Sequence, residues 1–526
     1  MIFKDTLRQG LEKKAKKKEW DFNQFIFTFE LVPARASKGK AVDDIIRFAQ
    51  DAASVKRISA LSITDNAGGH PALTPQALGS EIKSMGIAPI IHFSCKDKNR
   101  NRIESELFEL DRAGLNTLLV MTGDNPRYGY MGRAKPVFDL DSVLVLAMIQ
   151  EMQQGLVIHQ KAPGGGVRLP KMDFYSGCVV SSFKRTFPEQ VLQYLKLKRK
   201  LQAGAQFVIS QMGYDVRKYQ ELKLILEKMN PAVPLLGTVL IPSVKLARII
   251  YKNLIPGCTL PKRLLEQMES WPIQKALELR LDMAARLVAI LYGLGYHGVH
   301  LSGPGLEYRH IHQVIEMARE YASNWQEHVS AFLFPEEWDS FLFHKDPATG
   351  LNNHQLKSFS KDYKASLAPP YVIGKVIHAL FFEPDRGLFN IAKKLIETCR
   401  GKRCISWLTS FEYFFKELLY HCQRCGDCYL GDLEFLCPQS QCAKRLVNGP
   451  CGGSNEGWCE VWPGEKRCLF VRLFHRASWD TDILFKDQDI VPPRDWALDR
   501  QSSWLNFYLG RDHNRKIRNR DKKQIK

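Results

Sequence analysis

The chain contains no uninterrupted apolar run that approaches the roughly 20 residues a helix needs to cross a bilayer. Its first twenty residues include five lysines, Lys13, Lys14, Lys16, Lys17 and Lys18, but no apolar stretch with a small-residue cleavage site follows them. The first absence excludes an integral membrane protein, and the second argues against a secretory signal. We therefore expect a cytoplasmic protein.

Acidic residues are in deficit, because 56 Asp and Glu face 75 Lys and Arg, for a net charge of +19. With 45% hydrophobic and 25% charged residues, the chain has the composition of a folded protein of two to four domains. Part of the excess lies in residues 511–526, where eight of 16 residues are Arg or Lys. No aromatic residue is interleaved with these charges, so we expect a solvated, disordered tail and no nucleic-acid partner.

A Gly-rich dinucleotide-binding turn is also missing, since neither Gly68-Gly69 nor Gly164-Gly165-Gly166 has the required spacing. This absence disfavours an open doubly wound sheet, which is the alternative fold. The sequence does contain eight short apolar runs with helix-like segments between them, and this pattern predicts a (β/α)8 TIM barrel within about the first 330 residues. The expected strands are Phe25–Pro33, Ala60–Asp65, Ala88–Cys95, Thr117–Gly123, Phe174–Ser182, Phe207–Tyr214, Pro234–Leu240 and Gly298–Gly303.

Polar residues at the carboxyl ends of such strands share one rim, where barrel enzymes keep their catalytic groups. Carboxylates, an imidazole and a carboxamide that face one pocket are suited to acid–base chemistry. Because Phe29 and Leu31 flank Glu30, we expect partial desolvation to raise the pKa of its carboxyl, as a general acid at neutral pH requires. The rim candidates are Glu30, Thr64, Asp65, His92, Asp124 and Gln211.

Eight of the 13 cysteines fall within residues 422–468. Without a secretory signal, a disulfide framework is disfavoured. Three thiolates within residues 422–428 would repel one another unless a cation or cluster neutralised them, and eight thiols would complete two four-thiolate sites. The expected metal ligands are Cys422, Cys425, Cys428, Cys437, Cys442, Cys451, Cys459 and Cys468.

Four segments resemble methylenetetrahydrofolate reductase in their order and spacing: residues 27–33 (FTFELVP), 89–95 (PIIHFSC), 114–126 (GLNTLLVMTGDNP) and 198–211 (KRKLQAGAQFVISQ). The likeness extends over roughly the first 310 residues, through Gly298-Val-His300. It implies a flavin-bearing (β/α)8 barrel, the fold that the strand pattern predicts.

By this resemblance Glu30 is the catalytic acid that assists opening of the five-membered ring of methylenetetrahydrofolate, after which reduced flavin delivers hydride to the one-carbon unit. Asp124 corresponds to the catalytic residue that influences flavin reactivity and binds the pterin, and Gln211 corresponds to a further folate contact. The positions implied to bind FAD or FMN are Thr64, His92, Thr122, Gly123, Arg199 and Lys200, the last two near its phosphate.

Two departures from the family pattern bear on the cofactor and the electron donor. Thr122 stands where the family often has Arg, which leaves the choice of flavin open. After Gln211 the family's aromatic run is reduced to Met212-Gly213-Tyr214, at the place where nicotinamide and folate alternately stack in the family. We therefore expect an electron route other than direct reduction by NAD(P)H, from a ferredoxin-like protein or a reductase subunit.

Residues 437–453, above all Asn448-Gly-Pro-Cys-Gly-Gly453, resemble the cysteine-rich module associated with some bacterial methylenetetrahydrofolate reductases; the likeness covers roughly residues 375–475. The triplet Cys422, Cys425 and Cys428 with a distant Cys437-Pro438 is similar to ferredoxin ligation. Iron–sulfur, as 4Fe-4S, is therefore favoured, and structural zinc stays the alternative.

The resulting prediction has a flavin-binding reductase barrel at 1–326, a connector at 327–370, a cysteine-rich α+β domain that binds a metal or cluster at 371–510, and a basic tail at 511–526. The predicted function is interconversion of 5,10-methylenetetrahydrofolate and 5-methyltetrahydrofolate, and a homo-oligomer is left open. Two alternatives remain: a zinc-stabilised nucleic-acid-binding protein, and a flavin-free folate barrel that delivers a methyl group.

Overall fold

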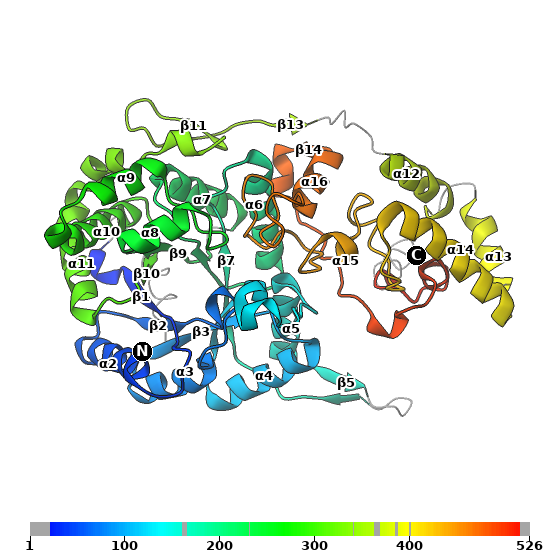
Figure 1. Ribbon diagram of the computed structural model, residues 1–526, viewed down its shortest axis with the longest axis horizontal. Helices are drawn as coiled ribbons and strands as arrows, with labels where there is room; N and C mark the ends of the chain where they lie inside the picture. Colours follow the sequence, from blue (N-terminus) through cyan, green and yellow to red (C-terminus); the bar gives the residue numbers. More distant parts are fainter. Residues whose placement is uncertain are drawn as a thin grey trace.

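A computed structural model of the chain describes residues 21–159, 166–230, 232–339, 341–361, 369–383, 388–398 and 401–515. Eight parallel strands close into a barrel in the order β1-β10-β9-β8-β7-β4-β3-β2 (Figure 1). All eight expected strands are confirmed, and each is trimmed by one to four residues at its ends. They are β1 (Ile26–Leu31), β2 (Ala60–Ile63), β3 (Ala88–Ser94), β4 (Thr117–Met121), β7 (Tyr175–Val180), β8 (Phe207–Ser210), β9 (Leu235–Leu240) and β10 (Gly298–Ser302).

The inside of the barrel changes character along its axis. Near the amino ends of the strands it is apolar, with a cluster that includes Ile26, Ile90, Phe207 and Leu236. Because side chains alternate between the two faces of a strand, the next inward positions on β1 and β10 are Thr28 and His300, followed by Glu30 and Ser302. The interior of the barrel is therefore apolar at the amino ends of the strands and polar at their carboxyl ends.

Helices surround the barrel and bury its outer apolar faces in one continuous core. The helices of this part are α2 (Lys40–Val55), α3 (Pro75–Ser84), α4 (Arg100–Ala113), α5 (Ser142–Gln154), α6 (Phe187–Gln202), α7 (Val216–Met229), α8 (Val244–Tyr251), α9 (Lys262–Ser270), α10 (Ala276–Gly293) and α11 (Tyr308–Tyr321). Short 3₁₀ turns are η1 (Phe22–Gln24), η2 (Ala67–Gly69), η3 (Pro126–Gly132) and η4 (Ile273–Lys275). A hairpin of β5 (Val157–His159) and β6 (Gly166–Arg168) follows α5.

The segment expected to be a connector packs on the barrel. After η5 (Ala322–Phe332) and η6 (Pro335–Glu337), a hairpin of β11 (Phe343–Lys345) and β12 (Asn352–Leu356) lies against α7. Arg217 of α7 donates to the side chain of Asn352 at 2.7 Å and to the carbonyl of Phe343 at 3.0 Å.

The C-terminal cysteine-rich region, residues 369–515, lies beside the barrel next to α5 and α6 (Figure 1). It consists of helices and loops rather than an α+β mixture, since its only strand in the described residues is β14 (Trp479–Asp480), paired with β13 (Ser360–Lys361). The elements are α12 (Pro369–Phe381), α13 (Phe389–Thr398), α14 (Lys402–Tyr420), α15 (Pro438–Gln441), α16 (Leu469–Arg476), η7 (Thr481–Leu484), η8 (Trp496–Leu498) and α17 (Ser503–Tyr508).

Two further expectations concern the basic C-terminal tail and the absence of a membrane-spanning helix. Residues 516–526, most of the tail expected to be disordered, lie outside the described residues, whereas Asp512 and His513 are buried. Among the helices that are described, none has the length and apolarity to cross a membrane.

Candidate active site and cysteine centres

Glu30 lies near the carboxyl end of β1 in a network of hydrogen bonds. Ser302 donates to its Oε1 at 2.9 Å, and His300 Nε2 lies 3.8 Å from Oε2. The His300 ring is itself held by Thr28, whose Oγ1 lies 2.8 Å from Nδ1. With 26% of its side chain exposed, Glu30 still opens toward the rim.

The expected upward shift of the Glu30 pKa is wrong. Burial by itself raises the pKa, but the hydrogen bond with His300, the charges of His92 and His300, and the hydrogen bond from Ser302 together lower it to about 2. The sequence showed the apolar neighbours on the strand but not the polar groups that other strands bring to the carboxyl. In the ligand-free site Glu30 is ionised at neutral pH.

Two neighbouring side chains carry buried polar atoms without a partner among the described residues. They are Thr64 Oγ1, just after β2, and His92 Nε2, on β3. Burial lowers the pKa of His92 to about 4, so the ring is neutral at pH 7. Buried groups of this kind cost free energy unless a ligand or water satisfies them, so both side chains are ready to bind.

Glu30, His92 and His300 form the one group in the described part of the chain whose ligand atoms all lie within 4.8 Å of one another, close enough to share a metal ion. Two of the three already have protein partners, because Ser302 binds Glu30 and Thr28 binds His300. His300 Nε2 is 3.8 Å from Glu30 Oε2, longer than the roughly 3.2 Å that direct proton transfer needs.

Asp124 lies at the same, carboxyl, end of the barrel as Glu30. Its Oδ2 accepts a hydrogen bond of 2.9 Å from the backbone N–H of Gly68. Thr122 before it is buried, and Gly123 has a φ of +81° in the left-handed region, where a Cβ would meet Lys96 and Ser94 at 3.0 Å. Glycine is therefore required at this turn.

Cys258 lies within the electrostatic influence of both acidic side chains. Burial, followed by the charges of Asp124 and Glu30, raises the pKa of its thiol to about 12. Its neighbour Gly257 packs so closely that a Cβ would lie 3.1 Å from the carbonyl of Gly452 and 3.7 Å from Gln211 Nε2. The predicted residues Glu30, Asp124 and Gln211 thus meet at one rim, together with a loop of the cysteine-rich region.

The basic pair expected near the flavin phosphate is already bonded within the protein. Arg199 Nε donates to the carbonyl of Asp489 at 3.0 Å, and Lys200 Nζ donates to the carbonyl of Val179 at 2.6 Å. Burial lowers the pKa of Lys200 to about 8. Each of these bonds uses one N–H donor of its side chain, so they do not exclude a phosphate contact.

Asp65, the remaining rim candidate, is bonded to neighbouring protein groups. Its Oδ2 accepts from Ser94 Oγ at 2.7 Å and from Lys98 Nζ at 2.9 Å. Lys98 also binds Glu106 at 2.7 Å, which makes a buried ion network.

Three buried lysines attach the cysteine-rich region to the barrel. Lys196 of α6 donates to the carbonyls of Gly449 at 3.1 Å and Pro450 at 2.9 Å. Lys184 donates to the carbonyl of Ser454 at 2.7 Å and also to that of Gly452. From the other side, Lys444 donates to the carbonyl of Gly123 at 2.7 Å and forms an ion pair with Glu460. The Asn448–Ser454 loop is thereby fixed at the active-site rim.

The eight cysteines separate into two quartets, each around a small cavity. The first is Cys422, Cys425, Cys428 and Cys437, and the second is Cys442, Cys451, Cys459 and Cys468. The four-residue helix α15 joins Cys437 to Cys442, so the quartets are neighbours. Burial raises the pKa of Cys422 to about 11, and that of Cys425 and Cys468 to about 12, so a bound cation has to displace protons.

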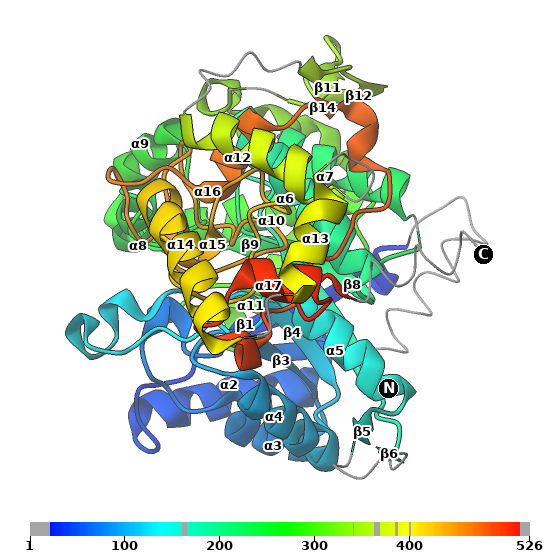
Figure 2. The same cartoon turned by 90° about the vertical axis from the view of Figure 1, so that its right-hand side faces the viewer.

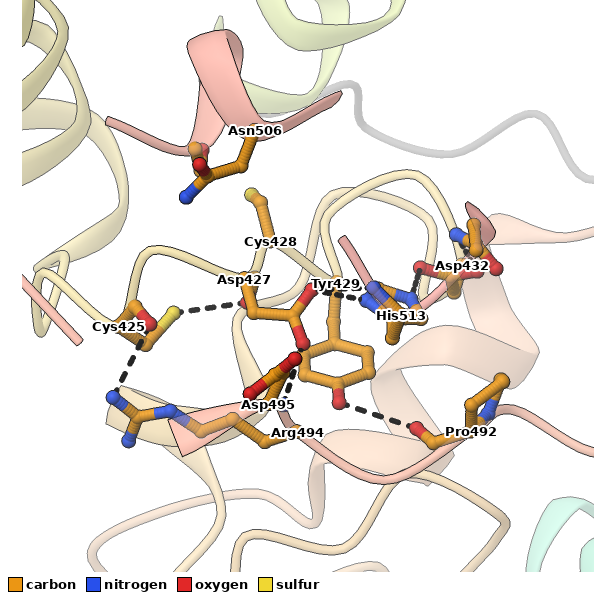
Figure 3. A network of polar contacts seen from close by, with 12 residues as sticks. Cys425, Asp427, Cys428, Tyr429, Asp432, Pro492, Arg494, Asp495, Asn506 and His513 are labelled. Atoms are coloured by element: carbon orange, nitrogen blue, oxygen red, sulfur yellow. Dashed lines mark hydrogen bonds and ion pairs between the residues drawn. The ribbon is translucent and has the colours of Figure 1, made fainter. Parts of the chain in front are cut away.

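A polar network lies beside Cys425 and Cys428 of the first quartet (Figure 3). His513 lies between Asp427, which contacts its Nδ1, and Asp432, whose Oδ2 is 3.2 Å from Nε2, and its ring stacks on Tyr429 at 4.2 Å. Asp427 is in the chain between Cys425 and Cys428, and its carbonyl accepts from the Cys425 thiol at 3.0 Å. The C-terminal segment therefore braces the loop that carries three of the thiols.

Sequence reasoning missed several of these residues. His300 lies on a predicted strand, and its inward register could have marked it. Cys258, Lys184, Lys196 and Lys444 carry no local signal, because their roles arise from contacts between distant parts of the chain.

A closed parallel barrel with an acid, two imidazoles and a carboxamide at its carboxyl rim defines a (β/α)8-barrel enzyme. Residues 15–307, more than half of the chain, match the family described as "Methylenetetrahydrofolate reductase". The chain belongs to this family, and membership implies methylenetetrahydrofolate reductase activity. Residues 406–497 match a second family, described as "Methylene-tetrahydrofolate reductase C terminal".

Among solved structures, the chain is similar to an uncharacterized protein from Clostridium thermocellum that binds two copies of 5-methyl-5,6,7,8-tetrahydrofolic acid, with 16% identity over 57% of this chain and 95% of that one and a TM-score of 0.37. It is also similar to 2,3-dimethylmalate lyase, a PEP mutase/isocitrate lyase superfamily member, with 13% identity over 62% of this chain and 87% of that one and a TM-score of 0.33. These likenesses carry no argument about function. No curated protein matches the chain.

Proposed function

We propose that this protein is a flavin-dependent reductase that interconverts 5,10-methylenetetrahydrofolate and 5-methyltetrahydrofolate, with electrons passing through the cysteine-rich region. The observation that carries the proposal is the position of the second quartet. Lys444 lies in the cavity wall of that quartet and donates to Gly123, next to Asp124. A redox centre held there would lie against the rim where the folate carbon is reduced.

The acid–base part of the reaction is assigned to Glu30 and Asp124. A folate ring nitrogen has to be protonated before its carbon accepts hydride, and a nearby carboxylate stabilises the cation that develops. Since its pKa is about 2 in the ligand-free site, Glu30 has to receive a proton before it can act as the acid. His300 Nε2 is 3.8 Å away, so a proton would pass from it through one water or after the contact shortens on binding.

A bound flavin would supply the hydride, and the rim offers groups to hold it. Among the described residues, Thr64 Oγ1 and His92 Nε2 are buried without hydrogen-bond partners, as are Ser181 Oγ and Ser182 Oγ, which follow β7. The roles of Thr122 and Gly123 stay predictions. Arg199 and Lys200 each have N–H donors beyond the one given to a carbonyl, so a phosphate contact stays a prediction for both.

The spacing of the thiols supports iron–sulfur over zinc. Four sulfurs around one tetrahedral zinc, at about 2.3 Å each, lie about 3.8 Å from one another. In the described residues no three cysteine sulfurs lie within 4.8 Å of one another. A 4Fe-4S core is larger than a single ion and holds its four thiolates further apart than zinc does.

The test is anaerobic purification followed by visible and electron paramagnetic resonance spectra and metal analysis. We expect flavin absorbance, iron in both quartets, and bleaching of the oxidised flavin on addition of 5-methyltetrahydrofolate. A colourless protein that cannot be reconstituted with flavin would refute the proposal. Zinc in place of iron would refute the electron route but leave the folate chemistry standing.

A further inference from the structure

Helix α14 buries charged side chains and exposes apolar ones. Its inward face carries Glu412, Lys416 and Tyr420, one turn apart, and all three are buried. Lys416 Nζ donates to Glu412 at 2.8 Å and to Ser503 at 2.6 Å, and it lies 3.6 Å from the Cys428 sulfur. The charged face of the helix therefore serves the first quartet, and the apolar face is left for the outside.

The outward face of α14 is an exposed apolar stripe at helical spacing: Trp407, Phe411, Phe414, Phe415 and Leu418. The side chains of Trp407, Phe414 and Leu418 have 67%, 64% and 69% of their surface in solvent. Single exposed apolar residues are ordinary, but a stripe of five along one helix is not.

Helices α12 and α13 extend the apolar surface. Fourteen of the 27 exposed large apolar side chains in the described residues lie on or beside these three helices, between positions 372 and 418. Figure 2 shows α12, α13 and α14 together on the side of the molecule that faces away from the barrel. We call this surface, described residues 369–418, the apolar face. A concentration of this kind marks an interaction site.

Exposed cations outnumber anions on the apolar face. The described residues 369–418 contribute five exposed or half-exposed cations, Lys375, Lys393, Lys394, Lys402 and Arg403, against Glu383, Glu397 and Glu417, which leaves 5 − 3 = +2. Glu412 is buried and paired with Lys416, so it does not offset this charge. A partner that binds the apolar face should therefore present apolar groups together with negative charge.

A second copy of the chain is disfavoured as the partner, because pairing the face with itself would bring like charges together. A span through a bilayer is excluded for the helices of the described residues. An anionic lipid surface fits, since Trp, Phe and Leu side chains enter the boundary of the acyl chains while Lys and Arg bind the headgroups. We propose that the apolar face docks the protein on an anionic phospholipid membrane.

A cavity lies between the apolar face and the first quartet. A cavity of about 340 Å³ lies between α12, α14 and α17, and Ile377 and Phe415 of the apolar face line it. Its wall also includes Cys428 of the first quartet and Lys416. On a membrane, this cavity would open from the lipid side toward a cysteine centre, while the barrel rim stays in water.

The test is flotation of the full chain with vesicles of phosphatidylcholine, with and without phosphatidylglycerol, at physiological salt. We expect binding to the anionic vesicles only. Trp407→Ser with Phe414→Ser should reduce binding at least ten-fold, whereas Ile273→Ser, which removes an apolar side chain 90% exposed elsewhere, should not change it. Unchanged cysteine-bound metal and circular dichroism in each variant would show that the fold is intact.

Two measurements separate this face from the basic termini. Lipids brominated on the acyl chains should quench wild-type fluorescence more than that of Trp407→Phe. Lys393→Gln with Lys394→Gln should weaken binding roughly five-fold per charge, but Lys262→Gln with Lys486→Gln should not. Absence of binding, binding unaffected by the Trp407 and Phe414 changes, or a protein that purifies with a second polypeptide covering these residues would overturn the proposal.

Discussion

The barrel and the cysteine-rich region share an apolar core but differ in what else they bury. In the barrel, strands and helices place apolar side chains inward, and polar groups gather at one rim. In the cysteine-rich region, thiols and paired charges such as Glu412 with Lys416 are inside, while much of the apolar surface of α12 to α14 is outside. We therefore expect the second region to depend on what its cysteines bind and on the apolar core that it shares with the barrel.

The largest effect is expected from a substitution at the rim of the barrel. Glu30→Gln should reduce folate turnover by about 10² to 10⁴-fold, because an amide cannot donate the proton, while reduction of the flavin by an artificial donor stays unchanged. Single-turnover absorbance would measure both steps. Ser302→Ala is the matched control, since it removes one hydrogen bond to Glu30 but keeps the acid, and we expect a loss of less than about ten-fold. Normal folate turnover in Glu30→Gln would remove its assigned role.

Removal of metal should separate the two regions most clearly. Chelation, or Cys425→Ser together with Cys451→Ser, should leave residues 371–515 sensitive to limited proteolysis while the barrel survives, because bound metal supplies much of the folding free energy of such a centre. Each single variant should lose about half of the metal, since the quartets are separate. Equal protection of both regions without metal would show that the second region has a sufficient core of its own.

The junction between the regions should depend on one buried cation. Lys444→Met removes the ion pair with Glu460 and the bond to Gly123, and leaves the buried Glu460 carboxylate without its cation, although the Cys451 thiol still donates to it at 3.3 Å. We expect a loss of about 3–5 kcal/mol in the free energy of unfolding, measured by denaturant titration. Arg127→Gln, which removes an exposed bond to the Val461 carbonyl, should cost less than about 1 kcal/mol. A similar loss in both variants would contradict the special position of Lys444.

The smallest expected effect depends on pH and concerns the brace at the C-terminus. Asp427 and Asp432 raise the pKa of His513 from 6.5 to about 9, against the opposing effect of burial. A raised pKa contributes stability that is fully present below pH 6.5 and is lost as the pH rises through about 9. In His513→Gln this contribution, at most about 3 kcal/mol, should vanish. Denaturation midpoints of the cysteine-rich region that fall across this window in the wild type alone would match the expectation.

The sequence by itself determined the barrel and its ligand types. Eight apolar runs with helical segments between them specify eight strands, since burial on both faces requires continuous apolar residues. Because parallel strands end at one rim, Glu30, Asp124 and Gln211 had to lie together once the strands were known. Three cysteines within seven residues likewise indicated a metal or cluster before any geometry was available.

Only the tertiary structure decided the ionisation of Glu30, the partners of Arg199 and Lys200, the division of eight thiols into two quartets, and the outward turn of the α14 stripe. Each of these depends on groups that lie far from one another in the chain. The periodicity of α14 showed that one face is apolar, but periodicity does not tell whether that face is buried or exposed. The contacts of Lys416 with Ser503 and Cys428 decide it, because they hold the charged face on the inner side.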